Sequence, residues 1–467
     1  MESLRKTFFK QNGILAWIVC LGMLMSNMIV QGINCSFGEL MSTIINEFDS
    51  DLASVSLIPS IHSFAYYLSG YICSILVKWY SFRCLAFFGG LASCIAFVAS
   101  IFSSNITSLT ISYGLFGGMG NGIVYIPGLI ACGFYFDDHK RALATSIATS
   151  GNGIGIIVIP ILMNYINENY GWRDSMLFLS LISPVICLVS LVMLPLSMLS
   201  VDTEATLLLQ NATTVEDGQN NNNLQITDVK NNHPNQETKS DSIQLQNDSN
   251  TSAYFAQTKH FFLDSWNLLK QPKLLMYCIS HGLLMVGYFI PIDFLSSMMV
   301  EKHGISTELS GYIVPIMGVA NFVGNLFTGV FITKFKLSPL SLHTWYNIGC
   351  GISCFLFCFC NSYAEFVAIA FMYGMFSGPI SMLIMECLAK MFGMDLVKDT
   401  IGFIMLVYAM GSVIGAPIGG YIYDIGNDFD GVFCFSAALY LLAAICGGYS
   451  FFLNRKYEKI TAEYTRI

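Results

Sequence analysis

Two halves of this 467-residue chain repeat each other in one register, at an offset of 260 residues. Three patterns recur at that offset: Tyr-Gly-x-Phe-x-Gly at 113–118 and 373–378, Gly-x-x-x-Ser-Cys at 89–94 and 349–354, and Gly-x-x-x-Gly at 151–155 and 411–415. All three lie in apolar sequence and keep the same chain direction. Parallel repeats in a membrane protein are typical of two similar helical bundles with a substrate site at their interface.

The composition predicts a membrane protein. Of the residues, 54% are hydrophobic and 11% are charged, whereas about 25% are charged in ordinary soluble proteins. A helix needs about 20 mostly apolar residues to cross a bilayer. Such stretches recur near residues 13–36, 52–77, 83–103, 108–134, 142–166, 173–198, 273–299, 309–333, 339–360, 364–389, 399–423 and 431–453.

These stretches form two sets of six, separated by a segment rich in Asn, Gln, Ser and Thr. A segment of that composition buries too little apolar surface to fold. We therefore expect an all-α membrane protein with twelve transmembrane helices in two six-helix, pseudo-symmetric halves. The expected domains are an N-terminal bundle at 1–198, a largely disordered linker at 199–272, a C-terminal bundle at 273–454 and a tail at 455–467.

The basic residues predict the orientation. Fifteen of the 22 lysines and arginines fall on one side of the expected spans, and only Arg173 and Lys302 fall on the other. Lysine and arginine near span ends are retained on the cytoplasmic side. Both termini and the linker are therefore expected in the cytoplasm, in a multi-pass protein of the plasma membrane. No basic stripe suggests nucleic-acid binding, and no metal cluster, nucleophile–base arrangement or phosphate loop suggests an enzyme or a cofactor.

Several motifs together resemble one transporter family. Residues 135–155, with Tyr-Phe at 135–136, Lys-Arg at 140–141 and glycines at 151, 153 and 155, resemble the fifth-span signature of the monocarboxylate transporter family within the major facilitator superfamily. The sequence Tyr-Gly-Trp-Arg at 170–173 is similar to that family's external turn before span six. The resemblance covers nearly all spans and none of the linker. It implies the major facilitator fold and transport of small organic solutes, and some relatives need a single-span accessory glycoprotein as partner.

The chain departs from that family where charge matters. The resemblance implies a lysine late in span one, and an aspartate and an arginine four residues apart in span eight, in the proton-coupled members. Here the corresponding residues are Cys35, Asn321 and Asn325. Residues four apart share a helix face, so the geometry is retained while the charges are lost. Asparagine can hydrogen-bond a polar solute but cannot titrate.

Ionisable side chains inside the spans are candidates for proton or ion coupling, because they are costly to bury in lipid. They are His62, which is also a candidate for substrate binding, His281 and Asp293. Alternatively, a neighbouring carbonyl or hydroxyl satisfies His62, and Asp293 is hydrated and structural. His343 is expected at the cytoplasmic interface.

Uncharged polar residues complete the expected substrate site. The resemblance places Tyr67 in the cavity. Further candidates lie on spans that line the cavity in this fold, although each could instead bond two helices together: Asn34, Asn121, Tyr125, Asn152, Ser377 and Ser381. At the cytoplasmic rim, Lys140 and Arg141 are expected to pair with Asp137 or Asp138 as a gate, or else only to anchor the helix.

The sequence thus predicts a secondary transporter of small organic solutes, monocarboxylate-like or amino-acid-like, that alternates access by uniport or exchange with little dependence on pH. Two alternatives stay open. One is a transport-inactive sensor or scaffold that retains the fold, and the other is a proton-coupled monocarboxylate symporter with a relocated proton site.

Overall fold

The computed structural model describes residues 12–77, 79–192, 267–426 and 428–464. Within these ranges every regular element is helical. Most of the predicted linker, and the chain before residue 12, lie outside the described residues. The helices from residue 12 to 192 and from 272 to 464 belong to one compact unit.

The first half contains six helical spans. The first span is α2 (Ile14–Ser36), which continues through the 3₁₀ turn η1 (Phe37–Leu40) into α3 (Met41–Phe48). The second and third spans are α4 (Leu52–Leu76) and α5 (Phe82–Ile101), and the fourth is built from α6 (Ile106–Leu109), η2 (Thr110–Gly117) and α7 (Gly118–Tyr135). The last two spans are α8 (Asp138–Tyr170) and α9 (Trp172–Val192).

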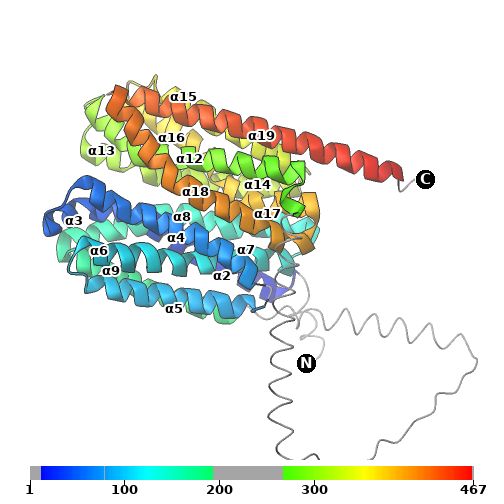
Figure 1. Ribbon diagram of the computed structural model, residues 1–467, viewed down its shortest axis with the longest axis horizontal. Helices are drawn as coiled ribbons and strands as arrows, with labels where there is room; N and C mark the ends of the chain where they lie inside the picture. The colour runs from blue at the N-terminus through cyan, green and yellow to red at the C-terminus, as the bar shows by residue number, and fades with distance from the viewer. Residues whose placement is uncertain (1–11, 78, 193–266, 427, 465–467) are drawn as a thin grey trace, which may run out of the picture. The chain divides into compact units, whose positions relative to one another are not determined.

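The second half repeats this plan. Its spans are α12 (Pro272–Glu301), the pair α13 (Thr307–Gly311) and α14 (Ile313–Thr333), α15 (Pro339–Phe357), the pair α16 (Tyr363–Ser377) and α17 (Pro379–Phe392), α18 (Met394–Gly426) and α19 (Phe429–Tyr464). In Figure 1 the blue to cyan helices form one bundle and the green to red helices form the other, lying alongside it.

Ten helical stretches of the described chain are long and apolar enough to cross a membrane. The other two predicted spans, α4 and α15, have 25 and 19 residues. They carry buried polar side chains, such as His62 in α4 and His343 and Asn347 in α15, which face neighbouring helices. These groups lower the apolar character of both helices without making them surface helices. The prediction of twelve spans in two six-helix halves is confirmed.

Glycines hold the helices of each half at close distance. A Cβ added at Gly155 of α8 would lie 2.1 Å from the backbone oxygen of Met28 in α2, and one at Gly415 of α18 would lie 2.4 Å from that of Val286 in α12. Any side chain at these positions must therefore push the helices apart. Gly155 and Gly415 are repeat partners, so the two halves use the same contact.

Glycines also line the contact between the halves. A Cβ at Gly153 of α8 would lie 2.6 Å from the backbone oxygen of Gly318 in α14, and one at Gly318 would lie 3.0 Å from that of Gly153. On the other interface, Gly402 of α18 lies against Ser74 of α4. The two bundles thus touch through small residues, so no large side chains protrude from either surface into the other at these contacts.

The helix α19 continues to Tyr464, past residue 454, where the sequence predicts the end of the C-terminal bundle. Its last turns project beyond the bundle in Figure 1. An Asn454–Glu458 hydrogen bond of 3.1 Å and a Lys390–Glu458 contact of 3.6 Å support them. The charges at 455, 456 and 459 mark where the apolar stretch ends, but they do not end the helix, because lysine, arginine and glutamate are good helix formers.

Gly155→Ala tests the close contact between α2 and α8. We expect a loss of about 1–3 kcal/mol of stability, because the methyl group overpacks a backbone contact. Gly420→Ala in α18 is the matched control, since nothing lies within 4 Å of its Cβ position, and we expect it to be neutral or slightly stabilising. The apparent melting temperatures of the purified variants in detergent measure both effects. Equal values for the two variants would contradict the packing described here.

Candidate functional site

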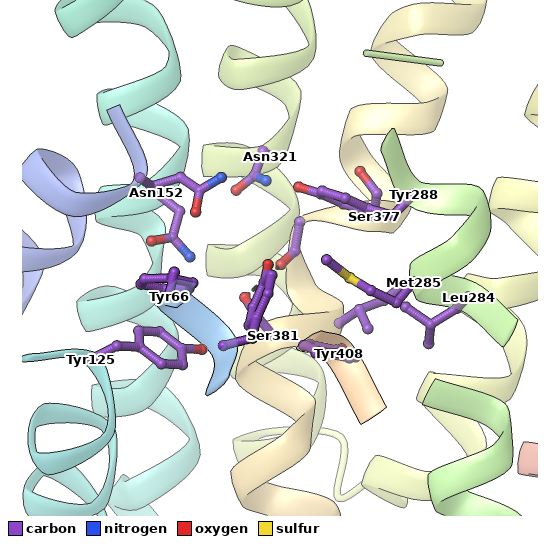
Figure 2. A pocket seen from close by; sticks show the side chains of 14 residues that line it. Tyr66, Tyr125, Asn152, Leu284, Met285, Tyr288, Asn321, Ser377, Ser381 and Tyr408 are labelled. Carbon is purple, nitrogen blue, oxygen red and sulfur yellow. Dashed lines mark hydrogen bonds between the residues drawn. The ribbon is translucent and has the colours of Figure 1, made fainter. Parts of the chain in front are cut away.

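A cavity with about 580 Å³ of free space, including its part open to solvent, lies between the halves. Its wall consists of Gln31, Tyr66, Tyr67, Tyr125 and Asn152 from the first half, and of Leu284, Met285, Tyr288, Asn321, Ser377, Gly378, Ile380, Ser381 and Tyr408 from the second. Figure 2 shows side chains of both halves directed toward the same space. Among these residues there is no lysine, arginine, histidine, aspartate or glutamate. The cavity is therefore polar but uncharged.

Tyrosine rings form much of this wall. The ring centroids of Tyr66 and Tyr125 are 5.8 Å apart, those of Tyr66 and Tyr67 are 4.8 Å apart, and Tyr67 lies 5.2 Å from Tyr408 of the second half. The hydroxyl group of Tyr408 lies 2.8 Å from Nδ1 of His281, which is buried behind the cavity wall, and this contact positions the tyrosine. The aromatic wall thus runs continuously from one bundle to the other.

The two asparagines of span eight lie at the interface of the halves. Asn321 lines the cavity. Asn325, one turn along α14, donates through Nδ2 to Oδ1 of Asn321 at 2.9 Å and accepts from Oγ1 of Thr149 in α8 at 3.0 Å. Asn325 itself is fully buried and does not line the cavity. The pair therefore orients one amide into the cavity and ties α14 to α8.

A second, smaller cavity of about 310 Å³ continues the first. The two share Tyr288, Asn321 and Ser377. The remaining wall residues of the second cavity include Cys35, Ile156, Ile292, Met317 and Tyr373. Each of them lies four residues along its own helix from a residue of the first wall, and these partners are, in the same order, Gln31, Asn152, Tyr288, Asn321 and Ser377. Four residues are one helical turn, about 6 Å. The space thus continues by one turn toward the end of the bundles where α2 meets α4.

An ion pair joins the two halves near the opposite end of the cavity. Arg141, near the start of α8, lies 3.3 Å from the carboxylate of Glu386 in α17, with 11% and 4% of the two side chains exposed. Arg141 also pairs with Asp138, whose side chain is 86% exposed. Glu386 is five residues beyond the cavity-lining Ser381, about 7.5 Å along α17. The buried pair therefore ties α8 of the first half to α17 of the second at this end of the bundles.

Asp137 makes two hydrogen bonds at the start of α8. Asp137 caps α8 by accepting from the backbone N–H of Lys140 at 3.0 Å, and it accepts from Nδ2 of Asn12 at 2.7 Å. The partner of Arg141 that joins the two halves is Glu386, 245 residues away. Arg141 and Asp138 pair as the sequence predicts, and the contact between the halves is the additional finding.

His62 and Asn121 lie inside the first bundle and not on the cavity wall. Nδ1 of His62 is 3.0 Å from the backbone oxygen of Tyr113, and Nε2 is 3.5 Å from Nδ2 of Asn121. Asn121 in turn accepts from Oγ of Ser93 at 2.9 Å. The alternative in which a neighbouring carbonyl satisfies His62 fits this geometry. The residue packs there because the π-helical segment η2 brings the Tyr113 carbonyl to its ring.

His281 lies one layer behind the cavity. The prediction that His343 lies at the cytoplasmic interface is corrected by the structure. His343 is fully buried, not interfacial, and its ring stacks on that of His281 with centroids 4.7 Å apart. Its Nε2 lies 3.0 Å from Oγ of Ser280. The helix α15 packs against α19, and Ser280 and His281 of α12 contact the ring of His343, so a histidine one turn inside the start of α15 is already enclosed.

Asp293 and Asn34 lie near the second cavity without lining it. Asp293 follows Ile292 of that wall along α12 and is exposed. Oδ1 of Asn34 is buried and has no hydrogen-bond partner in the described residues. His281 and Asp293 are twelve residues apart along α12, so they lie in different layers of the bundle.

Sequence reasoning found six of the residues that line the first cavity and missed the rest. Those found are Tyr67, Tyr125, Asn152, Asn321, Ser377 and Ser381. Gln31 could have been found, because it lies one turn before Cys35 on the same helix face. Tyr288 and Tyr408 carried no such signal, since tyrosines are common throughout the spans. The described residues contain no cluster of three metal-ligating side chains.

Comparisons with known proteins agree with this architecture. A family model described as Major Facilitator Superfamily matches residues 14–392 and 344–466. Monocarboxylate transporter 14 of Homo sapiens is 21% identical over 457 residues, covering 92% of this chain and 89% of that protein. Monocarboxylate transporter 2 of Rattus norvegicus is 23% identical, with coverage of 95% and 85%.

A solved structure shows the same fold at low sequence identity. The proton:xylose symporter XylE, bound to 6-bromo-6-deoxy-D-glucose, superposes with a TM-score of 0.66 at 12% identity, covering 92% of this chain and 94% of that one. The family match spans nearly the whole chain, and the twelve spans and the cavity between two bundles accord with it. The chain therefore belongs to the Major Facilitator Superfamily of multi-pass membrane transporters, as a divergent relative of the monocarboxylate transporters.

Proposed function

We propose that this protein carries a small organic solute across the plasma membrane by alternating access, as a uniporter or exchanger. The observation that carries the proposal is the uncharged polar cavity between the halves, which has a buried ion pair beyond one end and continues by one turn toward the other. A cavity of this kind is the expected midplane site of a transporter built from two repeats.

The proposed orientation follows from charge. Arg141, Glu386 and the basic residues of the short connections lie at one end of the bundles, which we take as cytoplasmic. The termini and the linker are then cytoplasmic, and the Arg141–Glu386 pair is the inner gate. A single-span accessory glycoprotein remains part of this proposal, as a partner for delivery to the surface.

The cargo is proposed to be other than a simple anion such as lactate. No cationic side chain lines the first cavity among the described residues, and a buried anion without a counter-charge is costly. A neutral or zwitterionic solute, such as an amino-acid derivative, meets hydrogen-bonding groups on Asn152, Asn321 and Ser377 at a lower desolvation cost.

In proteoliposomes, an inward proton gradient is expected to drive no accumulation of lactate by the wild-type protein. The double variant Asn321→Asp plus Asn325→Arg places a carboxylate and a guanidinium group in α14. We expect it to show proton-driven lactate uptake about tenfold above the background measured with the wild type, the equivalent of one charge-assisted hydrogen bond. Steep proton-driven lactate uptake by the wild type would contradict the proposal.

A metabolite-wide uptake screen in cells that express the chain tests transport itself. Uptake of at least one small organic solute above that of untransfected cells supports the proposal. Saturable binding with no flux for any solute would favour the transport-inactive sensor instead.

The gate is tested by removing one charge of the buried pair. Arg141→Gln leaves the Glu386 carboxylate buried and unpaired, which costs about 3–5 kcal/mol in the state that is closed at this end. We expect a large fall in uptake rate and a lower melting temperature. Asp138→Asn is the matched control, since this exposed partner contributes about 0–1 kcal/mol.

The reversed pair Arg141→Glu plus Glu386→Arg should recover part of both losses, because it restores opposite charges at the contact. If Arg141→Gln and Asp138→Asn transport equally well, the pair is not a gate.

A further inference from the structure

Five tyrosines from four helices surround the first cavity: Tyr66, Tyr67, Tyr125, Tyr288 and Tyr408. Three of their ring contacts, at 4.8–5.8 Å between centroids, form one connected wall across both halves. The face of an aromatic ring carries partial negative charge and attracts a cation within about 6 Å of its centroid. Several such faces around one space are the arrangement that recognises ammonium groups.

The other wall groups do not oppose a cation. Gln31, Asn152 and Asn321 each carry an amide oxygen, and Ser377 and Ser381 carry hydroxyl oxygens, all of which can accept from an N–H group or face a positive charge. No lysine, arginine or histidine of the described chain lines either cavity. A bound cation would therefore meet no repulsion there, whereas a bound anion would meet no counter-charge.

A carboxylate stands beside the route into the cavity. Asp293 is adjacent in α12 to Ile292, which lines the second cavity. It lies five residues beyond Tyr288, about 7.5 Å along α12. The side chain of Asp293 is exposed, and within the described residues it forms no ion pair. An unpaired carboxylate next to a cavity within the membrane attracts cations and repels anions.

We propose that the solute carries a positively charged nitrogen, as an ammonium or quaternary ammonium group, which passes Asp293 and binds among the five tyrosine rings. This inference rests on the proposed transport function and names the chemical class of its cargo. The ammonium group is the recognised feature, and Gln31, Asn152, Asn321 and the two serines bind the polar remainder of the solute.

Two pairs of probes test this directly on the purified full chain in detergent. Choline and 3,3-dimethyl-1-butanol have nearly the same shape and differ in charge. The same is true of 2-phenylethylamine, which is protonated at neutral pH, and 2-phenylethanol. Isothermal titration measures each affinity, with lactate as the anionic comparison. We expect at least one ammonium probe to bind about tenfold more tightly than its neutral partner. Equal affinities within both pairs, tighter binding of lactate, or no binding of either ammonium probe would overturn the proposal.

Three variants assign the selectivity to the wall and the carboxylate. Tyr67→Phe keeps the ring and should retain charge selectivity, whereas Tyr67→Leu removes the ring and should weaken the ammonium probe about tenfold while changing its neutral partner little. Asp293→Asn should weaken only the ammonium probe. Asp174→Asn, an exposed carboxylate in α9, is the matched control and should change neither. Melting temperatures identify any variant that is misfolded.

A flux assay separates this inference from the transport proposal. Charge-selective binding without flux in proteoliposomes would support the inference and contradict transport. Flux of neutral or anionic solutes without preference for the ammonium probes would support transport and overturn the inference.

Discussion

The contact between Gly153 of α8 and Gly318 of α14 is the constraint on which the arrangement of the two halves depends. Backbone meets backbone there, with room for no side chain on either helix. Gly329 against Ser146 on the same interface, and Gly402 against Ser74 on the other, continue the pattern. Interlocking side chains would fix one relative position of the bundles, whereas such small-residue surfaces let helices approach and turn against each other. The cavity lies between these two interfaces.

The placement of charge follows from the cost of burying it in the membrane. Polar side chains inside the first bundle, such as His62 and Asn121, are satisfied by neighbouring carbonyl, amide and hydroxyl groups. Among the described residues, neither cavity wall contains a charged side chain, and the Arg141–Glu386 pair and Asp293 lie beyond the walls on opposite sides. The middle is left to tyrosines and amides. The described wall therefore offers aromatic rings and hydrogen-bonding groups to a solute, with the carboxylate of Asp293 nearby.

The sequence predicts the fold well, because the apolar stretches mark the spans and the repeat marks the two halves. Gly155 and Gly415, which repeat at 260 residues, make equivalent contacts with Met28 and Val286, which are 258 residues apart. The small difference reflects loops of unequal length, so a single offset places helices but not every facing residue. Resemblance to a family places Asn321 on the cavity wall, since the fold defines which helices face inward.

The site was harder to predict, because it depends on contacts between distant segments. The partner of Arg141 is 245 residues away, and no local pattern marks Glu386 as its partner. Tyr408 differs from other span tyrosines only through its position between Tyr67 and His281. His343 looked interfacial from its position near the start of a span, yet it is buried against Ser280 and His281 of α12, and its helix packs on α19. In each case the packing of neighbouring helices, which the sequence does not state, determines the role.

Distances between the halves, measured by double electron–electron resonance, test the central claim most directly. One pair of spin labels, at Ser104 and Asn361, reports on the end where α2 meets α4, and a second pair, at Ser81 and Lys336, reports on the end that Arg141 and Glu386 close. All four positions are exposed, and spin-labelled amino acids introduced there leave the native cysteines in place. Alternating access predicts two populations whose distances change in opposite directions at the two ends when Arg141→Gln breaks the ion pair. One unchanged distance at each end would contradict the account.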